Sequence, residues 1–196
     1  AHLGIVRKFG VPAVVAINAF HSDTEAEWAL IKEAALKAGA VDAVVTRNWA
    51  EGGDGAVELA QAVVRAADIP SDVKPFYPLE LTIKEKIDRI AREVYGAEHV
   101  SYSAEAEKAI DMFGELGYQK LPICMAKTQY SLSHDPTLKG APKGFIFPVN
   151  DVRIAAGAGF IYPLSGEINT MPGLSSKPGY HGMDIDPDTG RIIGLS

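Results

Sequence analysis

Apolar and polar positions along the chain predict alternating strands and helices. The run VPAVVAIN (11–18) is continuously apolar and rich in β-branched residues, which predicts a strand covered on both faces in a parallel sheet. VDAVVT (41–46) predicts a second buried strand. Helical patterns follow each run, over about 23–37 and 55–67. Short strand–helix links of this kind predict right-handed βαβ units around a parallel sheet.

The first helix carries start and stop signals. Ser22 and Glu25 match a capping box, and Gly39 is placed to end the helix. Trp28 is expected to lie along this helix, away from any ligand. Apolar positions roughly three or four residues apart predict a buried stripe. They are Ala26, Leu30, Ala34 and Leu36.

The character of the chain changes after this region. The segment 68–81 carries three prolines and predicts an extended crossing, and Thr82 with Glu85 forms a capping box for the next helix. The remaining predictions are a helix end near 95–96, a strand at 99–102, a helix over 104–116, a buried strand at 121–126, a polar loop at 127–144, a β-rich region at 145–164 and a hairpin at 183–195. The pattern predicts an α/β protein with domains at 1–70 and 71–196.

Composition narrows the classes of function. The 196 residues include 47% hydrophobic side chains, enough for a substantial core, and carry a net charge of −6, which argues against nucleic-acid and anionic-membrane surfaces. Cys124 is the single cysteine, so no internal disulfide forms, which suits a reducing, cytoplasmic compartment. No apolar run approaches the roughly 18 residues of a membrane span. The chain opens without methionine, as expected for a piece of a longer protein.

Two aromatic residues follow the two early strands directly. Phe20 comes just after 11–18, and Trp49 just after 41–46. In a parallel sheet both rings emerge at the carboxyl edge, where ligands bind. Two facing rings would form a slot for a flat heterocycle, and Asn18 could hydrogen-bond its edge. The alternative interpretation is that both rings only cover the edge of the sheet.

The loop EGGDG lies beside this proposed slot. Glu51 begins it, and Gly52 and Gly53 would let the backbone approach a ligand closely. Two basic residues are candidate anion contacts. Lys127 follows the predicted strand 121–126, and Arg153 precedes a run of small residues. The alternative for each is an ordinary solvent-exposed side chain.

Several other motifs are incomplete. Neither G-x-x-x-x-G-K-[ST] nor G-x-G-x-x-G occurs, so this sequence contains no phosphate-binding loop. DIDPDTG resembles a calcium loop, but its twelfth position is Leu195 rather than Glu, so a hairpin turn is predicted. One cysteine and five scattered histidines predict no metal site.

The chain as a whole resembles one enzyme family. RKFGVPAVVAINAFHSDTEAE, WAEGGDGA, LPICMAKTQYSLSHDPTLKGAPKGF, VRIAAGAGFIYPLSGEINTMPGL and DIDPDTGRIIGL resemble, in that order, the carboxyl-terminal part of formate–tetrahydrofolate ligases. The resemblance implies a P-loop-type α/β sheet whose amino-terminal half is missing here, followed by a smaller α/β region with a β-rich tail. It also implies that Phe20 and Trp49 stack on a pterin or purine ring.

The resemblance further implies an ATP-dependent ligase that makes formyl phosphate and passes the formyl group to tetrahydrofolate. Mg²⁺ with ATP, a monovalent cation and a homo-oligomer are implied as well. The phosphate-gripping groups would come from a missing amino-terminal part, so no catalytic residue is assigned here. The alternatives are a non-catalytic folate- or purine-binding or oligomerisation module, and a stand-alone pterin- or purine-binding domain.

Overall fold

The computed structural model describes residues 1–166, 168 and 176–194. The chain divides into two compact units, Ala1–Gly166 and Glu167–Ser196, and each is described by itself. Helices and strands alternate along the first unit, which confirms the mixed α/β class. Of the helices in the described ranges, none combines the length and the apolar character that crossing a bilayer requires.

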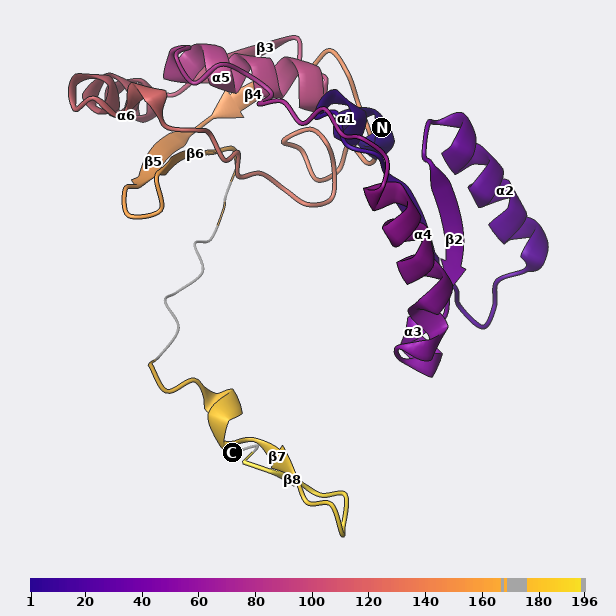
Figure 1. The fold of residues 1–196 in the computed structure, drawn as a ribbon. Coiled ribbons are helices and arrows are strands. Elements are labelled where there is room, and N and C mark those ends of the chain that lie inside the picture. Colours follow the sequence, from indigo (N-terminus) through magenta and orange to yellow (C-terminus); the bar gives the residue numbers. More distant parts are fainter. Residues whose placement is uncertain (167, 169–175, 195–196) are drawn as a thin grey trace. The chain divides into compact units, whose positions relative to one another are not determined.

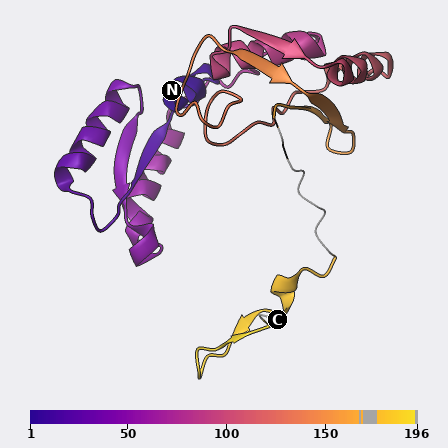
Figure 2. The same cartoon turned by 180° about the vertical axis from the view of Figure 1, so that it is seen from behind.

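The first part of the larger unit is built around two parallel strands. Its elements are α1 (His2–Lys8), β1 (Val14–Asn18), α2 (Glu25–Lys37), β2 (Asp42–Thr46), α3 (Asn48–Glu51), η1 (Asp54–Ala56) and α4 (Val57–Ala67). Strands β1 and β2 pair in parallel, as predicted. Helices α2 and α4 flank the strands on opposite sides in both views (Figures 1 and 2).

Coverage of β1 is less complete than the sequence predicts. Ile17 is the buried residue of this strand, whereas Ala16 and Asn18 are exposed. Within the described ranges the sheet consists of β1 and β2 alone, so β1 has a partner along one edge only. Helices lie on both faces of the strand pair, as predicted, but within the described residues β1 is only partly buried.

Helix α2 begins with a different capping box. Thr24 is the N-cap: its hydroxyl accepts the Glu27 N–H at 3.3 Å, and the Glu27 carboxylate accepts the Thr24 N–H at 2.8 Å. The predicted pair, Ser22 and Glu25, was wrong by two residues. Residues 20–23 already form a hydrogen-bonded turn, so the helix starts only after it.

The buried face of α2 also differs from the prediction. Ala35 is its buried residue, and Trp28, one seven-residue interval earlier on the same face, packs against the same cluster. The indole, the largest side chain of the helix, lies toward the sheet and sets which face is turned inward. The predicted stripe is consequently exposed at every position: Ala26, Leu30, Ala34 and Leu36.

The second part of the larger unit follows a crossing segment without helix or strand, as predicted. Its elements are α5 (Ile83–Ile90), η2 (Ala91–Tyr95), β3 (His99–Tyr102), α6 (Ala104–Glu115), η3 (Tyr118–Lys120), β4 (Ile146–Val149), β5 (Asp151–Ala155) and β6 (Phe160–Leu164). Strands β3 and β4 are parallel, and β5 and β6 form an antiparallel hairpin. The capping box of Thr82 and Glu85 is confirmed.

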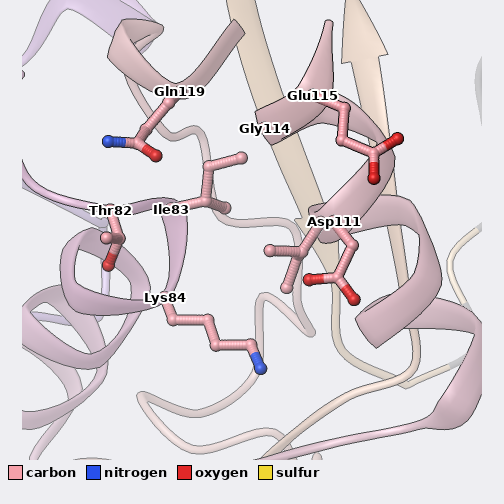
Figure 3. A pocket seen from close by; sticks show the side chains of 8 residues that line it. Thr82, Ile83, Lys84, Asp111, Gly114, Glu115 and Gln119 are labelled. Atoms are coloured by element: carbon pink, nitrogen blue, oxygen red, sulfur yellow. The ribbon is translucent and has the colours of Figure 1, made fainter. Parts of the chain in front are cut away.

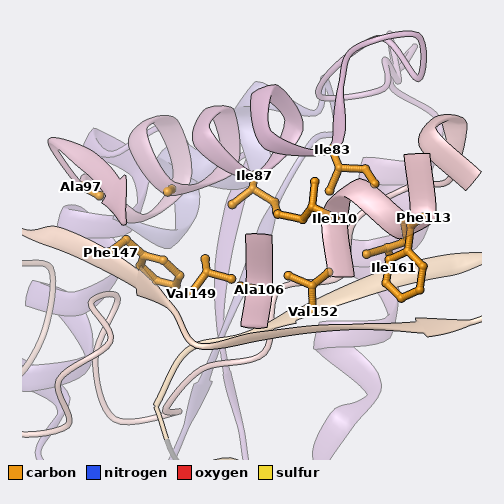
Figure 4. Packing of buried hydrophobic residues seen from close by; sticks show 11 residues of the cluster. Ile83, Ile87, Ala97, Ala106, Ile110, Phe113, Phe147, Val149, Val152 and Ile161 are labelled. Carbon is orange, nitrogen blue, oxygen red and sulfur yellow. The ribbon is translucent and has the colours of Figure 1, made fainter. Parts of the chain in front are cut away.

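Side chains from α5, α6 and strands β4–β6 form the main core (Figure 4). Ile87, Phe147 and Ile161 are fully buried there. Each such side chain contributes roughly 1.5–3 kcal/mol to the free energy of folding. Lys86 is buried as well, and its ammonium donates to the backbone carbonyls of Leu121, at 2.7 Å, and of Gln119. These bonds let a charged group occupy an otherwise apolar region.

The predicted buried strand at 121–126 is an irregular, half-buried segment. It runs parallel to β6 through isolated bridges, Ile123 to Ile161 and Ala126 to Leu164. Proline at 122 and at 163 removes two N–H donors from this pairing, so a continuous ladder cannot form. Alternate residues face solvent, and Cys124 is exposed.

The smaller unit contains the predicted hairpin. Strands β7 (Asp184–Ile185) and β8 (Ile192–Ile193) pair antiparallel, and the carboxylate of Asp186 accepts backbone N–H groups from Asp188, at 2.9 Å, and Thr189, at 3.1 Å. This carboxylate closes the turn. Leu195, the position that argued against a calcium loop, lies outside the described residues.

Candidate functional site

The two aromatic turns leave the sheet at the same edge. Asn18 pairs directly opposite Thr46, so β1 and β2 end side by side. The N–H of Ala19 then donates to the carbonyl of Thr46 at 3.0 Å, which extends the pairing one residue into the first turn. Phe20 and Trp49 therefore both follow the carboxyl ends of adjacent parallel strands, where α/β proteins bind ligands.

The turn that carries Phe20 is closed by Asp23. The Asp23 carboxylate accepts the Phe20 N–H at 2.8 Å, and the Asp23 N–H donates back to the Phe20 carbonyl at 3.1 Å. These two bonds fix the backbone without burying the ring, which is 61% exposed. A rigid turn thus presents an aromatic face to solvent.

Trp49 lies on a short helix that ends where the predicted EGGDG loop begins. Helix α3 begins after Arg47, whose carbonyl accepts the Glu51 N–H at 2.9 Å. Gly52 ends the helix with a φ of 59°, a conformation that glycine adopts at little cost. Trp49 is 86% exposed, so its indole is hardly packed against the core.

Gly55 holds the base of the Trp49 segment close to β2. Its carbonyl accepts the Arg47 N–H at 3.0 Å and lies 3.2 Å from the Thr46 hydroxyl. A β-carbon at Gly55 would lie 2.6 Å from the carbonyl carbon and oxygen of Arg47. By contrast, a β-carbon at Gly53 would meet nothing within 4 Å. Of these two positions, Gly55 is therefore the one where close packing against the backbone requires glycine.

The structure brings six of the eight predicted site residues to this one edge. Asn18 and Glu51 are exposed, and so are Gly52 and Gly53. Among the described residues, neither Phe20 nor Trp49 pairs with another aromatic ring. The phenyl ring of Phe20 and the indole of Trp49 are thus available to contact a flat ligand. Gly52 and Gly53 follow Trp49 closely in the sequence and add no side chains there.

The two predicted anion contacts belong to the second part of the unit. The Lys127 ammonium donates to the carbonyls of Thr128, at 2.8 Å, and Ser131, and partial burial lowers its pKa. The Arg153 Nε donates to the Asp151 carboxylate at 2.8 Å. Both cations therefore already have partners within the protein.

Three residues that the sequence did not assign to the site connect the two turns. The Trp28 Nε1 donates to Asp23 at 3.3 Å, and the Arg47 guanidinium lies 5.3 Å from the centre of the Trp28 ring. Trp28 does lie on helix α2, but its indole contacts residues of both turns. Arg47 follows β2 directly, and this position at the end of a strand was the one feature of the sequence that could have assigned Arg47 to the site.

The larger unit contains several hollows that are lined by described residues other than the predicted site residues. One of about 480 Å³ lies between the start of α5 and the end of α6, with Lys84, Asp111 and Glu115 on its walls (Figure 3). Its mixed charges show no single ligand preference. Within the described ranges, no three His, Cys, Asp or Glu side chains gather closely enough to hold a metal ion.

Gly55→Ala is expected to destabilise the protein, because the new methyl group collides with the backbone of Arg47. The free energy of unfolding, measured by urea denaturation, should fall by about 1–3 kcal/mol. Gly53→Ala is the matched control and should leave this free energy within about 0.5 kcal/mol of wild type. Equal effects of the two substitutions would contradict the close approach at Gly55.

The sequence matches known proteins over its whole length. Residues 1–196 match the profile of the family described as "Formate--tetrahydrofolate ligase". The chain is 52% identical to the formate--tetrahydrofolate ligase of Desulforamulus reducens over 194 residues, which cover 99% of this chain and 34% of that protein. It is also 52% identical to the enzyme of that name from Spinacia oleracea, over 100% of this chain and 31% of that protein.

A relative with a different name is similar as well. The cytoplasmic C-1-tetrahydrofolate synthase of Saccharomyces cerevisiae is 50% identical over 97% of this chain and 20% of that protein. The chain thus spans about a third or less of these relatives. The family match covers every residue of the chain, including both aromatic turns. The chain belongs to the formate–tetrahydrofolate ligase family.

Proposed function

We propose that this chain is the carboxyl-terminal segment of an ATP-dependent formate–tetrahydrofolate ligase and that it supplies the slot for a flat folate or purine ring. The observation that carries the proposal is the in-register pairing of β1 and β2, which ends both strands beneath exposed aromatic rings. Family membership over the full chain supports the enzyme over a non-catalytic binding or oligomerisation module.

The slot would bind its ligand by stacking. The turns that carry Phe20 and Trp49 are held by hydrogen bonds, while the two rings stay exposed. A bound heterocycle would remove these rings from water, and each stacked pair would contribute on the order of 0.5–1.5 kcal/mol beyond area burial. Asn18 would hydrogen-bond the ring edge, and Gly52 and Gly53 would allow close approach of the backbone.

The chemistry would depend on the rest of the enzyme. ATP would phosphorylate formate, and N10 of tetrahydrofolate would attack the formyl phosphate to release phosphate. This chain has no phosphate-binding loop motif, and the family resemblance implies that ATP and its Mg²⁺ bind the missing part of the enzyme. We therefore assign no catalytic residue here. Lys127 and Arg153 would contact an anion only in competition with their present partners.

The cellular setting is part of the proposal. We propose a cytoplasmic location, which the single cysteine and a cytoplasmic relative support, and we propose a monovalent cation and a homo-oligomer on the family resemblance. The net charge of −6 gives no support for a nucleic-acid partner.

A chimeric enzyme tests the activity. This chain replaces the matching third of the Desulforamulus reducens ligase, and ATP-dependent formation of 10-formyltetrahydrofolate is measured. The chimera should be active, the isolated chain inactive, and Trp49→Ala in the chimera should raise the KM for tetrahydrofolate by about tenfold, since one stacking face is lost. A folded chimera without activity would support the non-catalytic module instead.

Tryptophan fluorescence tests the slot separately. The chain has two tryptophans, Trp28 and Trp49, so each variant leaves a single reporter. Titration with folate should quench Trp28→Phe saturably, because Trp49 contacts the ring. Loss of the Trp28 Nε1–H bond to Asp23 should weaken the affinity without abolishing the quenching. Trp49→Ala should show no saturable quenching. Equal quenching in both variants would refute the slot, and Leu30→Ala, on the exposed face of α2, is the control for substitution in general.

A further inference from the structure

We propose that Asp23, Trp28 and Arg47 form a bridge that holds the two aromatic turns at a fixed separation and thereby sets the affinity for the flat ligand. None of the three would touch the ligand, so they are positioning residues. The inference rests on the proposed slot between Phe20 and Trp49.

The bridge begins at Asp23. One carboxylate oxygen, Oδ2, accepts both the Phe20 N–H at 2.8 Å and the Trp28 Nε1–H at 3.3 Å. A charged acceptor strengthens both bonds relative to neutral ones. The backbone that carries Phe20 is therefore tied to a side chain of helix α2, not only to its own turn.

Trp28 is the central piece. Its ring is partly buried and packs against the small core that contains Ile17 and Ala35, so it cannot move without disturbing α2 and β1. Arg47 belongs to the second turn, and its guanidinium lies 5.3 Å from the centre of the Trp28 ring, within cation–π range. The indole thus faces an anion along its N–H edge and a cation over its ring.

Arg47 completes the path to Trp49. Its backbone carbonyl accepts from Ala50, at 3.0 Å, and Glu51, at 2.9 Å, which starts helix α3. The direction of α3, and with it the position of Trp49, depends on the backbone of Arg47. Holding the Arg47 side chain over Trp28 therefore restrains the second ring relative to the first.

Arg47→Met tests the bridge, because it keeps an unbranched apolar stem and removes the charged guanidinium that lies over the Trp28 ring. Folate affinity is measured by fluorescence, and the backbone amide resonance of Phe20 is measured by NMR without ligand. The proposal predicts an affinity about threefold to tenfold weaker, with the free energy of unfolding nearly unchanged, and a shifted Phe20 amide resonance on the opposite turn. Arg47→Lys should restore part of the affinity.

The matched control is Arg65→Met, which removes an exposed arginine of α4 that pairs with Asp42. It should leave the Phe20 resonance and the affinity unchanged. Asp23→Asn provides a second variant should Arg47→Met fold poorly, and it should weaken folate binding and shift the Trp28 indole N–H resonance. One result would overturn the bridge: Arg47→Met lowers the folate affinity and the free energy of unfolding together, and Arg47→Lys restores neither. Arg47 would then have an ordinary structural role.

The bridge and the slot can fail independently. A Phe20 resonance that moves in Arg47→Met, in a protein that does not bind folate, would keep the bridge and reject the slot. Folate binding that is intact in Arg47→Met and in Asp23→Asn, with an unmoved Phe20 resonance, would reject the bridge and keep the slot.

Discussion

The in-register pairing of β1 and β2 is the constraint on which the candidate site depends. Asn18 lies opposite Thr46, and the Ala19 N–H donates to the Thr46 carbonyl, so the two strands end together. A slip of one residue would turn every side chain of a strand to the other face and shift one turn along the sheet relative to the other. Because the register is fixed, two rings that are 29 residues apart in the sequence follow strands that end at the same edge of the sheet, and hydrogen bonds hold the turn of each ring.

Local patterns predicted those parts of the fold that depend on neighbouring residues. The parallel strands, the capping box at Thr82 and the carboxyl-terminal hairpin follow from apolar runs, a four-residue motif and a turn sequence. Predictions failed where a contact outside the local motif determines the structure. Two overlapping capping motifs precede α2, and the turn closed by Asp23 selects the second. The segment 121–126 has the composition of a strand, but prolines in it and in its partner interrupt the ladder.

The same distinction applies to the candidate site. An aromatic residue directly after each buried strand was visible in the sequence, and so were the adjacent glycines. The connection through Trp28 was not, because the direction of its indole depends on the rotation of α2 about its axis, which the apolar spacing alone misassigned. The requirement for glycine at position 55 likewise arises from a contact across the loop with Arg47, which the letters GGDG do not reveal.

Intermolecular nuclear Overhauser effects between bound folate and the protein would test the slot most directly. The account predicts cross-peaks from the aromatic protons of the ligand to the ring protons of both Phe20 and Trp49 in one saturable complex. Cross-peaks to only one of the rings, or to residues of the second part of the unit alone, would contradict it.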